Sequence, residues 1–405
     1  MREGWEMKKL GEVCIVERGS SPRPIEKYQT TSTDGVNWIK IGDTKGVDKY
    51  IYTTKEKITK EGAEKSRYVK EGDFILSNSM SFGKPFIMKT DGYIHDGWFV
   101  FRLPDYLDKD FFYYLLTSPV VQEQIQGLGS GSVVKNISGD LVKKVDLVIP
   151  PLPEQQQIVA YLDQTFAKLN QAKANTLQNL KNAKELFETE LQSIMENGKM
   201  KVGNGEWEEK KLKEIGITQT GNTPKTNEPD NYGDYIPFVK PPHFLKDGTI
   251  DTKDSFLSEK GLKNGRLFKE NTILMVCIGA TIGKTGFTKI PVSSNQQING
   301  LTPKAEYDAR FFYYAMISKY FQSKVMEEGK GAQATLPIIN KSKWENLTIP
   351  FPKSLQTQQE IVAKLDALKT QTQALEASYQ AKLNNLEELY SGILKRAFEP
   401  QLIEA

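Results

Sequence analysis

The sequence predicts an α+β fold: a tandem repeat of two mixed, mostly β globular domains, each followed by a long α-helix, with the two helices packed as an antiparallel coiled coil. Three observations predict it. The chain of 405 residues repeats itself at an interval of about 200, each copy opens with strand and turn patterns, and each copy closes with a Gln-rich helical pattern. We expect globular domains at residues 1–150 and 201–352, and long helices at residues 151–200 and 353–405.

The repeat is carried by short segments that return in the same order. They are WEMKKL at 5–10 and WEEKKL at 207–212, FFYY at 111–114 and 311–314, and QQIVAYLD at 156–163 and QEIVAKLD at 359–366. Because the interval is nearly constant along the whole chain, chance is a poor explanation. The aromatic FFYY segments are expected to lie in the core, and Trp5 and Trp207 to anchor the packing at the start of each copy.

The first 150 or so residues of each copy are rich in Gly, Thr and Asn and contain short alternating apolar runs. Residues 38–41 and 74–76 are examples, and both predict strands. Residues 111–126, which include the first FFYY segment, have a helical pattern instead. Each globular domain is therefore expected to be mostly β with a few helices.

Pro-rich segments at 150–153 and 350–352 stop the strand pattern, and a long helix is expected to begin after each. In both helices apolar residues recur at steps of three and four, as in a coiled-coil seam. The seam residues are Leu162, Leu169, Leu180, Phe187, Leu191 and Ile194 in the first helix, and Ile361, Leu365, Leu368, Thr372, Leu375, Tyr379, Leu386, Tyr390, Ile393 and Ala397 in the second. A helix of about 40 residues would be roughly 60 Å long, too long to bury itself on one small domain, so the two helices are expected to pack on each other and hold the domains apart.

Composition excludes several classes of protein. With two cysteines and two histidines, neither a disulfide framework nor a Cys/His zinc site can be assembled. The first residues contain no apolar signal segment, and no run approaches the roughly 18 apolar residues of a membrane span. We therefore expect a cytoplasmic protein with no membrane partner. The formal net charge is only +3, so any nucleic-acid binding must come from local patches.

No credible catalytic site is found, and we expect no bound metal or cofactor. Residues 279–285 are one residue short of a phosphate-binding Walker loop, and in the KPPH segment at 240–243 a lysine stands where amino-methyltransferases need a hydrogen-bond acceptor. Asp230, Asp251 and Lys253 fit the loose pattern of a metal-dependent nuclease. That pattern is short and has no equivalent in the first copy, so a solvated charged loop is the better interpretation.

Binding of DNA is favoured by two equivalent basic segments. Residues 40–70 contain nine basic and five acidic residues, and residues 240–269 contain seven and four. Basic side chains anchor phosphates, while Asn and Gln pair with adenine and Arg or Lys with guanine. The candidate DNA-binding residues are Lys40, Ser77, Asn78, Ser79, Lys84, Lys240, Lys284, Asn295 and Gln296. The alternative is an ordinary solvated surface in which Asn and Ser bond their own turns.

These motifs resemble those of the specificity subunit of type I restriction-modification systems. The resemblance covers essentially the whole chain. It rests on the WxxKKL openings, on GNTP at 221–224, on the Gly-Lys turns at 83–84 and 283–284, and on IPPLPEQQ at 149–156. The sequence departs from the usual pattern at His95-Asp96-Gly97, where the second copy has the more typical Ser294-Asn295-Gln296, and at 19–22, where GSSP is a looser form of GxTP.

The resemblance implies that each globular domain recognises one half of a split, asymmetric sequence in double-stranded DNA. It also implies that the helices dock two copies of a modification subunit, which carries S-adenosylmethionine and methylates adenine. A restriction subunit that uses ATP and magnesium would join them, while this chain would itself bind no cofactor and catalyse no reaction. The residues expected to dock the partners are Gln156, Ile158, Leu162, Gln359, Ile361 and Leu365.

Two other functions stay open at this point. A nuclease would use Asp230, Asp251 and Lys253 and would cut DNA in the presence of magnesium. A coiled-coil protein scaffold would bind partners and show no salt-sensitive affinity for DNA. Neither alternative needs two similar but diverged globular domains, whereas a split DNA target does.

Overall fold

The computed structural model describes residues 4–78, 83–128, 138–202, 206–245, 247–329 and 337–399. The chain forms two compact units. Unit 1 is Met1–Thr176 with Ala381–Ala405, and unit 2 is Leu177–Gln380. Each unit contains a globular part, which we call head 1 or head 2, and segments of both long helices, α6 (Leu152–Met200) and α12 (Leu355–Phe398).

Head 1 contains two five-stranded sheets and a two-stranded one. The first five-stranded sheet has the strand order β3 (Gln29–Thr30), β6 (Glu56–Ile58), β4 (Val36–Ile39), β10 (Gly92–Ile94) and β7 (Arg67–Val69). The second has the strand order β2 (Ile15–Arg18), β11 (Trp98–Arg102), β8 (Phe74–Ser77), β9 (Pro85–Met88) and β5 (Tyr50–Ile51). The two-stranded sheet pairs β1 (Glu6–Lys9) with β12 (Asp146–Ile149). The helices are α1 (Leu10–Val13), α2 (Lys60–Glu64), α3 (Lys109–Thr117), α4 (Pro119–Gly127) and α5 (Gly139–Val142), with 3-10 turns at Ile25–Lys27 and Ile41–Thr44.

Head 2 repeats this plan with four-stranded sheets. The first has the strand order β14 (Gly216–Thr220), β21 (Ile298–Pro303), β18 (Ile273–Val276) and β19 (Thr285–Phe287). The second has the strand order β16 (Phe256–Leu257), β15 (Tyr232–Val239), β20 (Val292–Ser294) and β17 (Leu267–Phe268). A two-stranded sheet pairs β13 (Trp207–Lys211) with β22 (Thr348–Pro352). The helices are α7 (Leu212–Ile215), α8 (Glu259–Asn264), α9 (Ala309–Ile317), α10 (Lys319–Gly329) and α11 (Lys341–Glu345), with 3-10 turns at Pro229–Asn231 and Pro241–His243. The expected mixed, mostly β domains are confirmed.

The FFYY segments lie in the core, as predicted. All four aromatic residues of α3 and of α9 are buried, and so are Trp5 and Trp207. The helical pattern at 111–126 is divided between α3 and α4, because Pro119 cannot donate a backbone hydrogen bond and Ser118 caps the new helix. Head and long helix are then joined by a tyrosine: in unit 1 the hydroxyl of Tyr114 donates to Asp163 at 2.5 Å.

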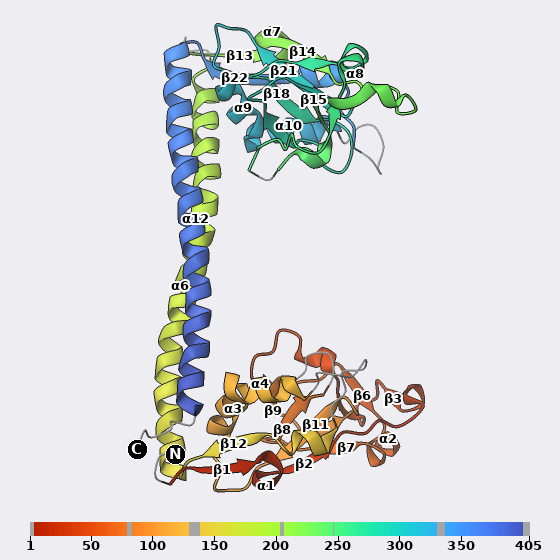
Figure 1. Cartoon of the computed structure of the whole chain (residues 1–405), viewed down its shortest axis with the longest axis vertical. Coiled ribbons are helices and arrows are strands. Elements are labelled where there is room, and N and C mark those ends of the chain that lie inside the picture. The colour runs from red at the N-terminus through yellow and green to blue at the C-terminus, as the bar shows by residue number, and fades with distance from the viewer. Residues whose placement is uncertain are drawn as a thin grey trace. The chain divides into compact units, whose positions relative to one another are not determined.

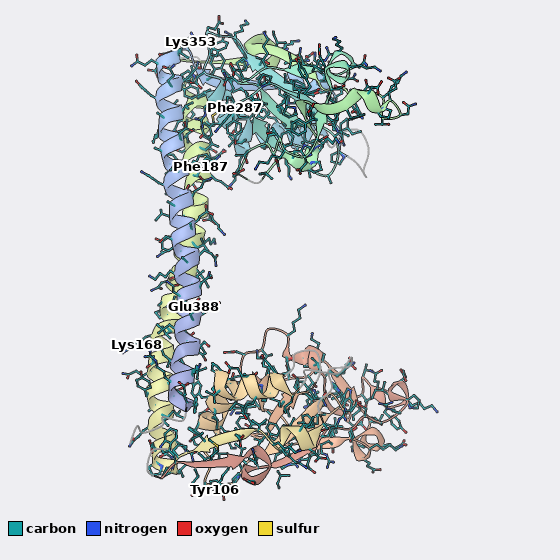
Figure 2. The ribbon with its side chains drawn as sticks, in the orientation of Figure 1. Tyr106, Lys168, Phe187, Phe287, Lys353 and Glu388 are labelled. Carbon is teal, nitrogen blue, oxygen red and sulfur yellow. The ribbon has the colours of Figure 1, made fainter. Side chains whose placement is uncertain are left out.

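The long helices run antiparallel, because the start of one packs against the end of the other within each unit (Figure 1). In unit 1 the rings of Phe166 and Tyr390 stack with centroids 4.0 Å apart. In unit 2 Lys364 forms an ion pair with Glu190 at 2.5 Å, and the ring of Phe187, labelled in Figure 2, lies 5.9 Å from that of Tyr314. The predicted coiled coil is confirmed.

One part of the predicted seam is wrong. Leu375 is 41% exposed, and the turn that the sequence pattern skipped is filled by Leu383, which is buried. The face of α12 that packs against its neighbours carries Leu365, Thr372 and Leu383. Leu375 lies outside that face, so its apolar side chain is left in solvent.

Candidate nucleic-acid interface

In head 1 two polar loops meet at the ends of neighbouring strands. The loop after β2 begins at Gly19, whose N–H donates to the carbonyl of Trp98 at 2.8 Å, and Ser20 N–H donates to the carbonyl of Ile94 at 3.2 Å. A Cβ atom at Gly19 would lie 2.0 Å from the carbonyl oxygen of His95. A glycine is therefore required where the backbones of the two loops approach.

Head 2 builds the same junction. Gly221 N–H donates to the carbonyl of Ile298 and Asn222 N–H to that of Ser294, both at 2.9 Å. A Cβ atom at Gly221 would lie 2.2 Å from the carbonyl oxygen of Asn295. The glycine that opens the GxTP-like motif thus has the same physical role in both copies.

A hydroxyl group two residues after each glycine then holds a side chain of the opposite loop. Ser21 Oγ donates to Asp96 Oδ1 at 2.7 Å, and Thr223 Oγ1 donates to Gln296 Oε1 at 2.5 Å. We call this arrangement the hydroxyl clamp. It presents Asp96 at the surface of head 1 and Gln296 at the equivalent place in head 2.

Three predicted residues of head 1 surround the clamp. Lys40 follows β4, pairs with Glu56 at 2.8 Å, and lines a hollow together with Arg23, His95 and Asp96. Ser77 ends β8 and is buried, as is Asn78. The amide of Asn78 donates to the backbone carbonyl of Asp96 at 2.9 Å. Ser79 lies outside the described residues.

The equivalent residues of head 2 are also brought together. Lys240 follows β15, and the neighbouring carbonyl of Val239 accepts a bond from Asn295 N–H at 3.2 Å. The Asn295 amide in turn donates to Gln297 at 2.9 Å. Gln296 is exposed and held by the clamp. Within the described part of head 2, Lys240 forms no ion pair, whereas Lys40 does in head 1.

Lys84 and Lys284 have other surroundings. Each follows a glycine with a positive φ, 81° at Gly83 and 88° at Gly283, which explains the Gly-Lys turn. Lys84 donates to the carbonyl of Val47 at 3.0 Å. Lys284 is exposed and lines a hollow formed with α6 and α12. Neither lysine is among the residues that line the clamp.

Burial and hydrogen bonds fix the charges around the head 1 clamp. The hydrogen bond from Ser21 lowers the pKa of Asp96, so this carboxyl group is ionised at neutral pH. Burial lowers the pKa of His95 below its usual 6.5, and its Nδ1 accepts a bond from Gly97 N–H at 2.8 Å. The hydrogen bond from Lys40 likewise lowers the pKa of Glu56. At neutral pH the loop thus presents a carboxylate beside a neutral imidazole.

The sequence reasoning did not select Ser21, Arg23, Asp96 or Thr223. Ser21 and Thr223 stand in the GxTP-like motif. The equivalent backbone bonds to Trp98 and Ile298 place Asp96 opposite Gln296, at the same interval of 200 that separates the FFYY segments, so the pairing of His95-Asp96-Gly97 with Ser294-Asn295-Gln296 taken from the motifs is wrong by one position. The repeat therefore contained a signal for these positions. Their proximity, however, depends on strand pairing between β2 and β11 and between β14 and β21.

At the start of each long helix one glutamine is buried and the glutamine that follows it is exposed. Gln155 is buried: its amide donates to the carbonyl of Pro150 at 2.9 Å and to that of Tyr106 (labelled in Figure 2) at 3.2 Å. Gln358 is buried in the same way in unit 2. Gln156 and Gln359 are exposed instead.

The apolar residues predicted for partner docking have a different position. Ile158 and Ile361 are partly buried, and Leu162 and Leu365 are almost fully buried in the cores of their own units. These two leucines hold each helix to its head. Of the six predicted docking residues, Gln156 and Gln359 are the exposed ones.

The carboxylates of the nuclease alternative have ordinary structural partners. Asp230 forms an ion pair with Lys260 at 3.3 Å, and Asp251 accepts the backbone N–H of Lys253 at 3.1 Å, closing a short turn. The described residues contain no group of three or more His, Cys, Asp or Glu side chains suited to a metal ion. No helix in the described ranges combines the length and apolarity needed to cross a membrane.

The repeat, the two heads and the coiled coil define a tandem two-headed protein, and comparison with known proteins identifies its family. Residues 2–181 and 204–385 each match the model of the type I restriction modification DNA specificity domain. The chain belongs to this family. The resemblance inferred from the sequence motifs is confirmed.

Curated relatives and solved structures agree. The chain is 23% identical over 375 residues to the type I restriction enzyme MjaIX specificity subunit of Methanocaldococcus jannaschii, covering 86% of this chain and 83% of that one. It is 24% identical over 328 residues to the EcoBI specificity subunit of Escherichia coli, covering 74% and 66%. The HsdS subunit of Thermoanaerobacter tengcongensis shares the fold with a TM-score of 0.65 at 21% identity, covering 99% and 98%. A chain from a structure of complex assembly in a type I R-M system gives 0.78 at 19% identity, covering 99% of both.

Proposed function

We propose that this chain is the non-catalytic DNA specificity subunit of a type I restriction-modification system. It recognises a split, asymmetric sequence in double-stranded DNA and directs adenine methylation and restriction by partner subunits. The observation that carries the proposal is the pair of hydroxyl clamps, which have the same backbone junction but present Asp96 in head 1 and Gln296 in head 2. Two equal scaffolds with unequal polar groups are what two different half-sites require.

The residues around the clamps divide into two kinds of contact. Lys40, Lys240 and the exposed guanidinium of Arg23 supply positive charge for phosphates, which fixes the position of the head on the duplex. Lys84 and Lys284, which do not line the clamps, are also assigned to phosphate anchoring. Asn78 is buried against the backbone of Asp96 and supports that loop. Asn295, Gln296 and Asp96 are the side chains assigned to base edges.

This assignment divides the chain into recognition domains and spacer helices. Residues 1–150 and 201–352 are the two target-recognition domains, and residues 151–200 and 353–405 are the spacer helices. Gln156 and Gln359 occupy equivalent exposed positions at the helix starts, so they are the proposed contacts for two copies of the modification subunit. That surface is supported by side chains that are buried or partly buried in the cores of the units, namely Ile158, Ile361, Leu162 and Leu365.

The chemistry is assigned to the partners. S-adenosylmethionine belongs to the modification subunits, and ATP with magnesium to a restriction subunit. Methylation of adenine in a duplex requires the base to leave the stack, so the role of this chain is to position the DNA for that step. The proposal includes a cytoplasmic location, because the DNA and the partner subunits act there.

Methylation mapping tests the recognition. DNA from cells that express this chain with its modification subunit is sequenced at single-molecule level. We expect a split adenine-methylated motif, one half of which changes when residues 201–352 are exchanged for those of another family member. Absence of any motif, despite a purified complex, would contradict the proposal and favour a scaffold that binds no DNA.

The docking assignment is tested by the mass of the purified complex. The wild-type chain is expected to bind two modification subunits. Gln156→Arg and Gln359→Arg should each remove one of them, because a bulky charge replaces a neutral group at the contact. Two bound copies in both variants would remove these glutamines from the docking surface and leave the recognition proposal standing.

A further inference from the structure

In both clamps the hydroxyl group donates to a side-chain oxygen, but the other polar atom of that side chain, which stays exposed, differs between the heads. In head 1 the clamp takes Oδ1 of Asp96, and Oδ2 lies 3.5 Å from the guanidinium of Arg23, whose side chain is 81% exposed. A carboxylate has no hydrogen to donate, so the group that head 1 presents is an acceptor.

In head 2 the clamp takes the corresponding oxygen of Gln296. The side-chain amide keeps its NH₂ group, which carries two donor hydrogens and has no acceptor among the described residues. Gln296 is exposed, so this donor faces solvent. The same clamp therefore presents an acceptor in one head and a donor in the other.

The scaffold itself does not require this difference. Both loops have the same two backbone hydrogen bonds to the opposite strand, and a serine or threonine hydroxyl donates equally well to a carboxylate or to an amide oxygen. Packing at the junction is set by Gly19 and Gly221, which are identical in the two copies. The choice between Asp96 and Gln296 is thus left free for recognition.

The loop that carries Asp96 in head 1 is held in place before DNA arrives. The backbone carbonyl of Asp96 accepts bonds from Arg18 Nε at 3.1 Å and from Asn78 at 2.9 Å. A Cβ atom at Gly97 would lie 2.2 Å from the ring of His95, so the loop turns tightly around that imidazole. A side chain that is already fixed loses little conformational entropy on binding, which sharpens discrimination between bases.

We propose, resting on the proposed function, that the two heads recognise base edges of opposite hydrogen-bond character. Asp96 of head 1 accepts from an exocyclic amino group in the major groove, which is N4 of cytosine or N6 of adenine. Gln296 of head 2 donates to an acceptor edge, such as N7 and O6 of guanine or O4 of thymine. The residue at the clamp is a specificity-determining residue of its half-site.

The test uses the full chain in complex with its modification subunit and exchanges the exposed group while keeping the clamped oxygen. Asp96→Asn leaves an oxygen for Ser21 and turns an NH₂ group outward, and Gln296→Glu does the reverse. In Asp96→Asn the preferred base at one position of one half-site should change from an amino-bearing to an acceptor-bearing base, with relative methylation shifting about tenfold or more. Gln296→Glu should change the other half-site only. Asp140→Asn, at an exposed position of head 1, makes the same charge change and should leave the motif unaltered.

A second measurement does not depend on the variants folding. Duplexes carry the wild-type motif with the implicated cytosine or adenine replaced by an analogue that lacks the exocyclic amino group. The wild-type complex should lose about tenfold in affinity for one of the two analogues, which also tells cytosine from adenine.

The outcomes separate the inference from the proposed function. A split wild-type motif with unchanged base preference in both variants, and no loss with either analogue, would overturn the inference and leave the specificity subunit assignment intact. Absence of a split motif for the wild-type complex would overturn both.

Discussion

His95 is a residue at which the two copies differ in titration as well as in shape. Its ring lies between Trp38 and Trp98, with centroids 6.2 and 6.3 Å away, and burial lowers its pKa below 6.5. The charged groups that face it are Asp96, Asp43 and Lys40. The equivalent residue in head 2 is Asn295, which does not titrate, so asparagine is the natural substitution at this site.

We expect His95→Asn to weaken the pH dependence of stability. Because the pKa of His95 is lower in the folded state, the unfolded chain takes up the proton first, and the wild type loses stability as the pH falls below about 6.5. The contribution is at most about 1.4 kcal/mol per pH unit. Urea denaturation at pH 7.5 and 5.5 measures it. The carboxylates away from His95 contribute equally to both proteins, and Asp96, whose pKa is lowered chiefly by the hydrogen bond from Ser21, is ionised at both pH values. Equal pH slopes for variant and wild type would therefore contradict the expectation.

At the scale of elements, each long helix is shaped by what it packs against. Near the end of α6, Gly198 faces the ring of Trp207 from β13, and a Cβ atom there would lie 2.2 Å from the ring. In α12, Gly392 has nothing within 4 Å of the corresponding position. Both residues are glycines in long helices, one buried against a ring and the other exposed, so they form a pair with different neighbouring surfaces.

Opposite effects are predicted for the two Gly→Ala substitutions. Gly198→Ala should destabilise unit 2 by about 1–3 kcal/mol, because the buried indole must move. Gly392→Ala should stabilise the chain by up to about 1 kcal/mol, because alanine loses less backbone entropy in a helix. Thermal denaturation of both variants beside the wild type makes the comparison. A stabilising Gly198→Ala would show that the helix does not depend on this contact.

For the whole molecule, the important feature is that unit 1 is assembled from both ends of the chain. Leu394 and Phe398 of α12 belong to the same core as Leu10 and Phe111, and the rings of Phe111 and Phe398 lie 5.4 Å apart. Removing the end of α12 would therefore damage the core of head 1 as well as any surface for partners. Assembly defects in such truncations have to be separated from unfolding.

Two buried thiols allow this separation. Cys14 lies in the core of unit 1 and Cys277 in that of unit 2, and burial raises the pKa of each to about 12. Neither thiol should react with iodoacetamide at pH 8 while its unit is folded, since the thiolate is the reactive form.

We expect Phe398→Ala to expose Cys14 at a lower urea concentration than Cys277. Loss of a buried phenyl ring costs about 3–5 kcal/mol, and the cost falls on unit 1. Mass spectrometry of the two labelled peptides follows each unit separately. Leu389→Ala, at a half-exposed position of the same helix, is the control and should leave both labelling midpoints unchanged. Simultaneous labelling of both thiols in Phe398→Ala would show that the units unfold as one.

The sequence by itself determined the repeat, the alternation of heads and helices, the aromatic core and the family. These features are local: periodicity marks the helices α6 and α12, prolines mark where they begin, and the FFYY segments bury themselves wherever a core forms. Among the DNA-binding candidates that it selected, Lys40, Asn295 and Gln296 lie close to the clamps in the structure.

Only the tertiary structure decided what these residues meet. Ser21 and Asp96 are 75 positions apart in the sequence, and the pairing of β2 with β11 brings their side chains within hydrogen-bonding distance. Packing against α6 left Leu375 in solvent and buried Leu383, and it placed Leu162 and Leu365 inside the cores of their units. Residue type and spacing encode local conformation, whereas contacts between distant segments depend on strand register and on which helix face the partner covers.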